Sequence, residues 1–217
     1  MAAETSSRLK LLRLAVFRDL GLSERSAEAR RIWHKKVVTW AFRDPFRLLA
    51  TDKTRQMVRS LISTAFTLWE DALNGSVKFY EEEFLSDDRN FLKPDVDIDI
   101  LFAEGEHGDD EPFDSTGGMV AHSRYPPEGI LHLDADEMWS FDGSNGVDLR
   151  YVIIHEIGHV LGLRHSKKKS SIMSKYYRSL DTGMKLPLAD IASIRRLYRV
   201  KSERQDALRR SSKKPSF

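Results

Sequence analysis

Three histidines and a glutamate stand at short, regular spacing in the run HEIGHVLGLRH. On a helix, residues four apart share a face, so His155 and His159 can direct their imidazoles at one point, with Glu156 beside it. Gly162 lets the chain leave the helix through backbone angles closed to other residues, and the turn returns His165 as a third ligand. This spacing predicts a metal site.

The ligand set indicates a catalytic zinc rather than a structural one, because three imidazoles leave the fourth tetrahedral position to water. Zinc lowers the pKa of its water towards about 7, and Glu156 can accept the proton and return it to the departing amine. The pattern HExxH alone also occurs on helices that bind no metal, but Gly162 and His165 argue against that alternative. Met173, which read alone is a core residue, follows the third histidine where a turn beneath the metal is expected.

A second region, residues 97–139, is dense in histidine and aspartate, and with the first it holds six of the seven histidines. A closed four-ligand set without a vacancy for water would form a structural zinc site from His107, Asp109, His122 and His132. Backbone carbonyls of the loop 115–119 and three carboxylates offer the hard oxygen ligands that calcium prefers, namely Asp114, Asp134 and Glu137. The alternative for these carboxylates is that they only keep acidic turns in water.

The composition is that of a soluble globular protein, and 217 residues suffice for one domain. The formal charge of +2 decides nothing about partners. With no cysteine, disulfides, thiolate ligands and thiol nucleophiles are excluded. No apolar run approaches the roughly 20 residues that a bilayer requires, and the stretch 9–17 is too interrupted by charge for a signal peptide. Either the protein stays where it is made, or the chain is a fragment of a longer precursor.

The histidines must be positioned by a sheet and helices, whose periodicities are visible in the chain. We predict strands at 37–42, 77–80, 96–102, 119–122 and 130–133, and helices at 52–73, 149–163 and 189–198, with Asp52 as the cap of the first helix. We divide the chain into a basic extension (1–31), a catalytic domain (32–199) and a basic tail (200–217). We interpret the extension as a weakly ordered leader rather than a membrane-surface helix, and the tail as a solvated end rather than an anion-binding segment.

Over roughly Trp33 to Tyr198 the chain resembles the matrixins, the matrix metalloproteinase family of the metzincin clan. The resemblance rests on HEIGHVLGLRHS with Ser166, and on DIDILFAEGEHGDDEPFD (97–114), GGMVAHS (117–123), HLDADEMW (132–139) and DIASIRRLY (190–198). It implies a collagenase-like α+β fold, with a twisted, mostly parallel five-stranded sheet and three helices. It also implies the two zinc sites above, and a calcium held by Asp114, Asp134 and Glu137 with the carbonyls of Ser115, Gly117 and Met119.

The resemblance further implies how substrate binds. A substrate segment would add as an antiparallel strand to the edge at Val120 and Ala121. Tyr151 would line the pocket for the residue after the cut bond and make it shallow, so we predict preference for medium aliphatic residues such as leucine there. Lys175 departs from the family, which usually has a proline at this place on the pocket wall. The family is mostly extracellular, which indicates a secreted protein.

We therefore expect a monomeric zinc-dependent endopeptidase that cuts extended segments of extracellular-matrix or other secreted proteins. Protein protease inhibitors are further expected partners, and no specific nucleic acid is expected. A different class is a catalytically silent metalloprotease fold that binds partners through its sheet edge or basic tail; the intact Glu156 favours the enzyme. Membership of another metzincin family is a lesser alternative. Ser166 and the region 97–139 argue against it.

Overall fold

The computed structural model describes residues 31–82, 92–181 and 183–200. The basic extension predicted over 1–31 and the basic tail predicted over 200–217 therefore lie, apart from one residue each, outside the described residues. In the described part, no helix is long and apolar enough to cross a membrane.

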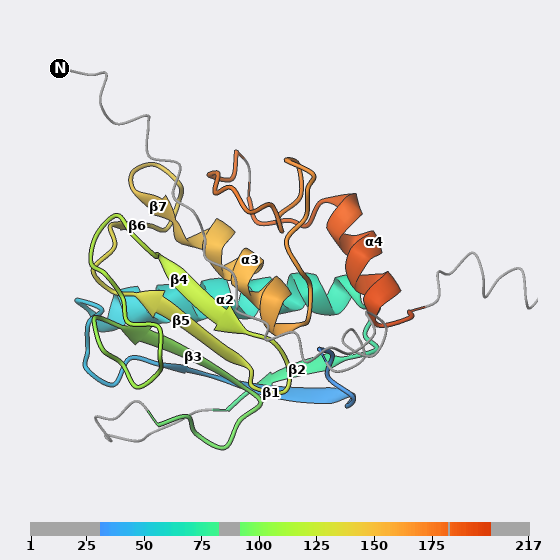
Figure 1. Cartoon of the computed structure of the whole chain (residues 1–217), viewed down its shortest axis with the longest axis horizontal. Helices are drawn as coiled ribbons and strands as arrows, with labels where there is room; N and C mark the ends of the chain where they lie inside the picture. The colour runs from blue at the N-terminus through green and yellow to red at the C-terminus, as the bar shows by residue number, and fades with distance from the viewer. Residues whose placement is uncertain (1–30, 83–91, 182, 201–217) are drawn as a thin grey trace, which may run out of the picture.

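A five-stranded sheet forms the base of the domain, as predicted (Figure 1). Its order is β2-β1-β3-β5-β4, and all pairs are parallel except β4 with β5. The central strand β3 is buried along its whole length, as its apolar run predicts. The strands are β1 (Val37–Arg43), β2 (Lys78–Glu81), β3 (Ile98–Ala103), β4 (Ala121–Arg124) and β5 (Ile130–Asp134).

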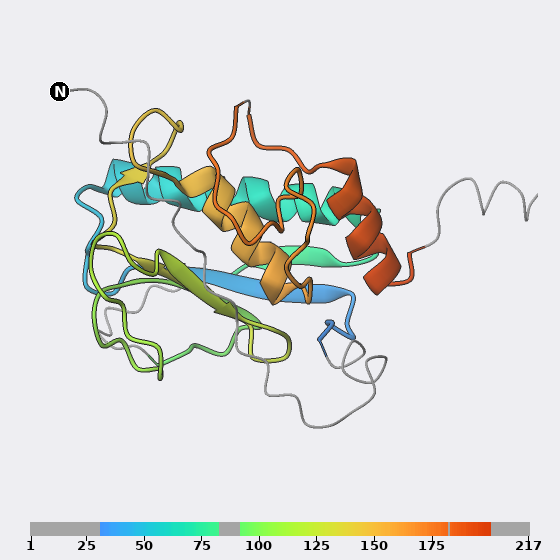
Figure 2. The same ribbon diagram turned by 45° about the horizontal axis from the view of Figure 1, so that its top comes forward.

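Three helices are described, α2 (Asp52–Ala72), α3 (Leu149–Val160) and α4 (Leu188–Leu197). Figure 2 shows α2 and α3 together on one face of the sheet, with α4 beside their ends. The apolar stripe of α2 faces this core, as its spacing predicts, through Val58, Ile62, Phe66 and Trp69. The mostly parallel sheet with three helices confirms the predicted α+β fold.

Three details differ from the sequence prediction. The cap of α2 is Thr51 rather than Asp52, because the Thr51 hydroxyl accepts a hydrogen bond from the Thr54 amide at 3.1 Å. Helix α3 ends three residues earlier than predicted, since Gly162 turns away with φ +101° and a side chain there would meet the Arg31 carbonyl. A two-stranded sheet of β6 (Trp139–Ser140) and β7 (Val147–Asp148) was not predicted.

Both ends of the described domain bind the last turn of α3. The Trp33 indole donates to the Val160 carbonyl at 2.9 Å, and the Tyr198 hydroxyl donates to the Leu161 carbonyl at 3.0 Å. These carbonyls have no partner within the helix, so the two side chains satisfy groups that a helix end leaves open. The end of α3 is thereby tied to residues that precede β1 and follow α4.

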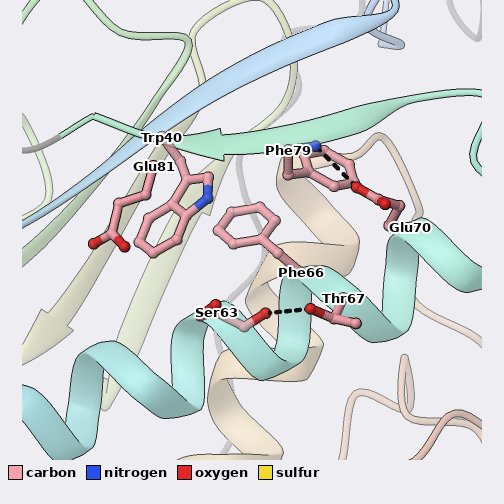
Figure 3. Close-up of a pocket in the computed structure, with 7 residues that line it drawn as sticks. All are labelled: Trp40, Ser63, Phe66, Thr67, Glu70, Phe79 and Glu81. Carbon is pink, nitrogen blue, oxygen red and sulfur yellow. Dashed lines mark hydrogen bonds between the residues drawn. The ribbon is translucent and has the colours of Figure 1, made fainter.

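A small hollow lies between α2 and the β2 edge of the sheet (Figure 3). Trp40 stacks on Phe66 with ring centroids 4.9 Å apart, and Phe79 packs against the same Phe66 ring at 5.0 Å. Glu70 and Glu81 also line it, and each forms an ion pair with a neighbouring cation. Because the hollow lies at the opposite end of the sheet from β4, it is separate from the histidine clusters.

Candidate metal centres

Helix α3 carries two of the predicted zinc ligands and is buried nearly all round. It begins at Asp148, whose carboxylate accepts a hydrogen bond from the Arg150 amide at 3.1 Å. Every residue from Tyr151 to Val160 is buried, because the helix lies between α2, the sheet and the loop that follows it. The imidazoles of His155 and His159 therefore sit in a protein interior rather than on a surface.

The three predicted histidines converge through their Nε2 atoms. His155 Nε2 lies 3.1 Å from that of His159 and 3.2 Å from that of His165. Two of the rings are oriented by hydrogen bonds at their other nitrogen. His155 Nδ1 lies 2.7 Å from the Ile172 carbonyl, and His159 Nδ1 lies 2.7 Å from the Leu163 carbonyl. A carbonyl can only accept, so each Nδ1 carries the proton.

The unprotonated Nε2 atoms of these rings thus face one another, which is unfavourable unless a cation lies between their lone pairs. Zinc bonds of about 2.1 Å in a tetrahedron separate ligand atoms by about 3.4 Å, close to the separations found here. The residues present therefore fit a zinc ion.

The electrostatics of the cluster also favour neutral imidazoles. Burial lowers the pKa of His155 well below its ordinary value, and the neighbouring His159 and His165 lower it further. Burial lowers the pKa of His159 to about 3. For His165, burial and then the positive charge of Lys175 lower the pKa. Neutral imidazole is the form that binds a metal.

Glu156 adjoins the cluster with its two oxygens in different surroundings. Its Oε2 accepts a hydrogen bond from the Ser123 hydroxyl at 2.5 Å, and both side chains are fully buried. Its Oε1 is buried and has no hydrogen-bond partner among the described residues. Burial raises the pKa of Glu156 to about 8, although the Ser123 hydrogen bond acts in the opposite direction. A cation beside the carboxylate would lower that pKa.

The second predicted set also comes together, on the other face of β4. His122 and His132 stand opposite each other in the β4–β5 register, with His122 Nε2 and His132 Nδ1 3.1 Å apart. Asp109 Oδ2 lies 2.8 Å from the first of these nitrogens and 2.9 Å from the second. His107 Nε2 completes the group 3.5 Å from His122 Nε2, while its Nδ1 faces the Gly105 carbonyl.

These four ligand atoms lie within 4.8 Å of one another, as do those of the three histidines on and after α3. Burial alone would raise the pKa of Asp109, but hydrogen bonds from His107, His122 and His132 outweigh it and lower the pKa far below its ordinary value. Three nitrogens and one carboxylate oxygen fit a second zinc ion with every position filled.

The carboxylates predicted for calcium are neighbours but do not form such a cluster. Asp114 accepts from the Met119 amide at 2.8 Å, and Glu137 accepts from the Gly117 amide at 2.7 Å. Burial and the negative charges of its acidic neighbours raise the pKa of Asp134 to about 6, and its Oδ2 has no hydrogen-bond partner among the described residues. The predicted carbonyl ligands Ser115, Gly117 and Met119 belong to the loop before β4. Calcium at this place stays a prediction.

The residues predicted to contact substrate lie around the first cluster. β4 is an edge strand of the sheet, and Val120 and Ala121 stand at its start with buried side chains. Tyr151 stacks on His155 with ring centroids 5.9 Å apart and donates its hydroxyl to the Tyr176 carbonyl at 3.3 Å. Tyr151 is itself fully buried, so its ring packs within the protein beside His155 rather than projecting into solvent.

The loop after α3 supports the cluster from below. Met173 packs against Gly158 so closely that a Cβ on Gly158 would lie 2.3 Å from the Met173 sulfur. Asp190, at the start of α4, accepts from the Ile172 amide at 2.9 Å and from the Ser171 hydroxyl. This buried carboxylate fixes the segment whose carbonyl orients His155.

The sequence prediction missed Ser123, Ser171 and Asp190. Their contacts span 18 to 33 residues. For Ser123 a weak signal exists, because alternation along β4 places it on the opposite face from His122 and hence towards α3. For Ser171 and Asp190 no local signal was present.

Comparison with known proteins finds similarity to one family, the matrixins, and to its metalloproteinases. The family model described as matrixin matches residues 32–199. Matrix metalloproteinase-16 of Homo sapiens is 38% identical over 172 residues, which are 76% of this chain and 27% of that protein. Karilysin of Tannerella forsythia is 37% identical over 72% of this chain and 30% of its own length. Metalloendoproteinase 5-MMP of Arabidopsis thaliana is 39% identical over 76% of this chain and 44% of its own length. The chain thus spans between about a quarter and a half of these relatives.

Proposed function

The chain belongs to the matrixin family of metalloendopeptidases, and from this premise we propose that it uses zinc to cut internal peptide bonds of extended protein segments. One observation carries the proposal: the inward-facing Nε2 atoms of His155, His159 and His165 meet beside a carboxylate with one unpaired oxygen. A structural zinc site would need a fourth protein ligand at this place, and none of the described residues supplies one.

Zinc held by His155, His159 and His165 supplies a Lewis acid that polarises the substrate carbonyl and makes water a stronger acid. Glu156 has the role of general base. Its Oε1 accepts the proton from the attacking water, and the same oxygen then delivers the proton to the departing amine. Ser123 holds the other oxygen, so the carboxylate keeps one orientation during both transfers.

Substrate would be held by backbone pairing along the free edge of β4, near Val120 and Ala121. This pairing stretches the peptide past the histidine cluster and places its carbonyl within reach of the water. Tyr151 closes the wall beside His155, and we propose that the resulting shallow pocket favours leucine after the cut bond. Equal or faster cleavage of peptides with very long side chains at that position would contradict this assignment.

The second cluster has a structural role in this proposal. Zinc on His107, Asp109, His122 and His132 would join β4 and β5 to the loop before them. Calcium near Asp114, Asp134 and Glu137 would neutralise three carboxylates on the same side of the sheet. We further propose that the protein works outside cells, where calcium is plentiful, as a monomer on secreted or matrix proteins, under control of protein inhibitors.

The test is cleavage of a quenched fluorescent peptide centred on Pro-Leu-Gly-Leu, with zinc and calcium present. Glu156→Gln keeps the size of the side chain and the contact with Ser123 but removes the base, so kcat should fall by about 10³-fold or more. Exposed Glu82 provides the matched control, and Glu82→Gln should cut like wild type. A hydroxamate chelator should also abolish cleavage. If folded, zinc-loaded wild type cuts neither this peptide nor a random peptide library, the endopeptidase proposal is wrong.

A further inference from the structure

The loop after α3 carries a concentration of positive charge that the cleavage chemistry does not use. Six cationic residues stand in fifteen positions, and no acidic residue occurs between Glu156 and Asp181. The whole chain has a formal charge of only +2, so the distribution is strongly uneven. All six are exposed. We call this set the basic rim: Arg164, Lys167, Lys168, Lys169, Lys175 and Arg178.

The loop brings the two parts of the basic rim together beside the third histidine. The Ser166 amide donates to the Met173 carbonyl at 2.7 Å, and Ser166 and Ser174 form an isolated parallel bridge. Lys167 and Lys175 each follow one partner of this bridge, so they stand side by side next to His165. The loop lies along α3 on the side away from the sheet (Figure 2).

The basic rim also adjoins the wall of the proposed substrate pocket. The Tyr176 carbonyl accepts a hydrogen bond from the Tyr151 hydroxyl. This bond holds Tyr176, which directly follows Lys175, against α3. The Lys175 ammonium lies 5.0 Å from the centre of the Tyr176 ring. Lys175 therefore lies directly before the residue that is held against Tyr151, beside the wall of the proposed pocket.

The cations of the basic rim lack acidic partners in residues 31–82, 92–181 and 183–200. Ion pairs in those ranges engage lysines and arginines elsewhere, just before and on β1, and on α2, β2, β4 and the start of α3. The Arg178 guanidinium donates to a carbonyl, that of Ser170. Uncompensated charge beside a cleft attracts and orients ligands of opposite sign.

We propose that the basic rim makes this protein select substrate segments with acidic side chains on the C-terminal side of the cut bond. The inference rests on the proposed endopeptidase function and adds to it the charge of the preferred substrate. Aspartate or glutamate there would lie against Lys167 and Lys175, while the aliphatic residue before it fills the pocket beside Tyr151.

The test uses two peptides of equal length around Pro-Leu-Gly-Leu, one continued by Glu-Asp and the other by Gln-Asn. Binding is measured by fluorescence anisotropy to zinc-loaded Glu156→Gln, which does not cut, and cleavage is measured with the active enzyme. The acidic peptide should bind about 5- to 10-fold more tightly, and the difference should vanish at 0.5 M salt.

Lys167→Gln with Lys175→Gln should bring the preference close to one. The matched control is Lys36→Gln with Lys53→Gln, which removes the same charge from exposed positions outside the loop and should keep the preference. Two outcomes would overturn the inference. One is equal binding of the two peptides to zinc-loaded Glu156→Gln, and the other is a preference for the acidic peptide that survives in the variant of the basic rim.

A sulfated polysaccharide is the competing partner of such a surface. If heparin bound the wild type and lost affinity in the variant of the basic rim, while the two peptides bound alike, the surface would belong to a polysaccharide and the inference would be wrong. Fluorescence anisotropy measures binding without turnover. If the acidic peptide bound more tightly but wild type cleaved neither peptide, the endopeptidase proposal would be refuted and the charge preference would stand.

Discussion

Replacing Ser123 with alanine removes the one hydrogen bond that the described residues make to the Glu156 side chain. Hydrogen bonds to charged groups contribute about 1.5–3 kcal/mol, and this one is fully buried and 2.5 Å long. If the bond holds Glu156 in the orientation that receives the proton, its loss raises the barrier by a similar amount. At about 1.4 kcal/mol per tenfold change, kcat should fall by about 10- to 150-fold.

The assay is steady-state cleavage of the Pro-Leu-Gly-Leu peptide, with zinc content and thermal stability measured on the same samples. The loss should appear in kcat with little change in KM, because Ser123 acts on the base and not on the substrate. Ser123→Thr keeps a hydroxyl and should recover much of the activity. Ser140→Ala is the control, since it removes a hydrogen bond from another buried serine to a carboxylate, that of exposed Asp142, away from Glu156. A kcat within twofold of wild type in zinc-loaded Ser123→Ala would refute the positioning role.

Three further predictions concern stability and can be checked by thermal or urea unfolding. Gly158→Ala should destabilise by about 1–2 kcal/mol, because the clash with Met173 outweighs the gain in helix propensity; a raised Tm would contradict this. Burial would raise the pKa of Asp148, but hydrogen bonds from Arg150 and Leu180 outweigh it and lower the pKa. The ionised Asp148 carboxylate therefore stabilises the folded state fully above about pH 4, and this stabilisation is lost as pH falls through the folded pKa. Asp148→Asn should therefore cost about 1–3 kcal/mol at neutral pH and progressively less as pH falls below about 4, and a constant difference would refute the assignment. Removing metal with a chelator should lower Tm by several degrees, since the facing imidazole nitrogens lose their common cation; an unchanged Tm would count against bound metal.

Local patterns in the sequence were sufficient for most of the fold. Alternation, helical periodicity and continuous apolar runs predicted all five strands of the main sheet and all three described helices, because each of these elements buries apolar side chains in the core. Errors arose at boundaries. The strand predicted at 119–122 is found at Ala121–Arg124, since the Met119 amide bonds the Asp114 carboxylate rather than a neighbouring strand.

The two histidine clusters were predictable for a different reason. Their members come from short motifs, and their spacing and ligand types were enough to group them before the resemblance to the matrixins was considered. The contact between Ser123 and Glu156 was not predictable in this way, because it joins a strand to a helix 33 residues later. It depends on how α3 lies on the sheet, which no local pattern specifies.

The hydrogen bonds from Trp33 and Tyr198 to the last turn of α3 bear on how the domain opens. A helix end normally frays in local fluctuations that cost little free energy. Here such a fluctuation would also have to detach the segments before β1 and after α4, so the ligand-bearing turn should exchange its amide hydrogens only when much of the domain unfolds. The backbone that carries the histidine cluster would then persist for as long as the fold does.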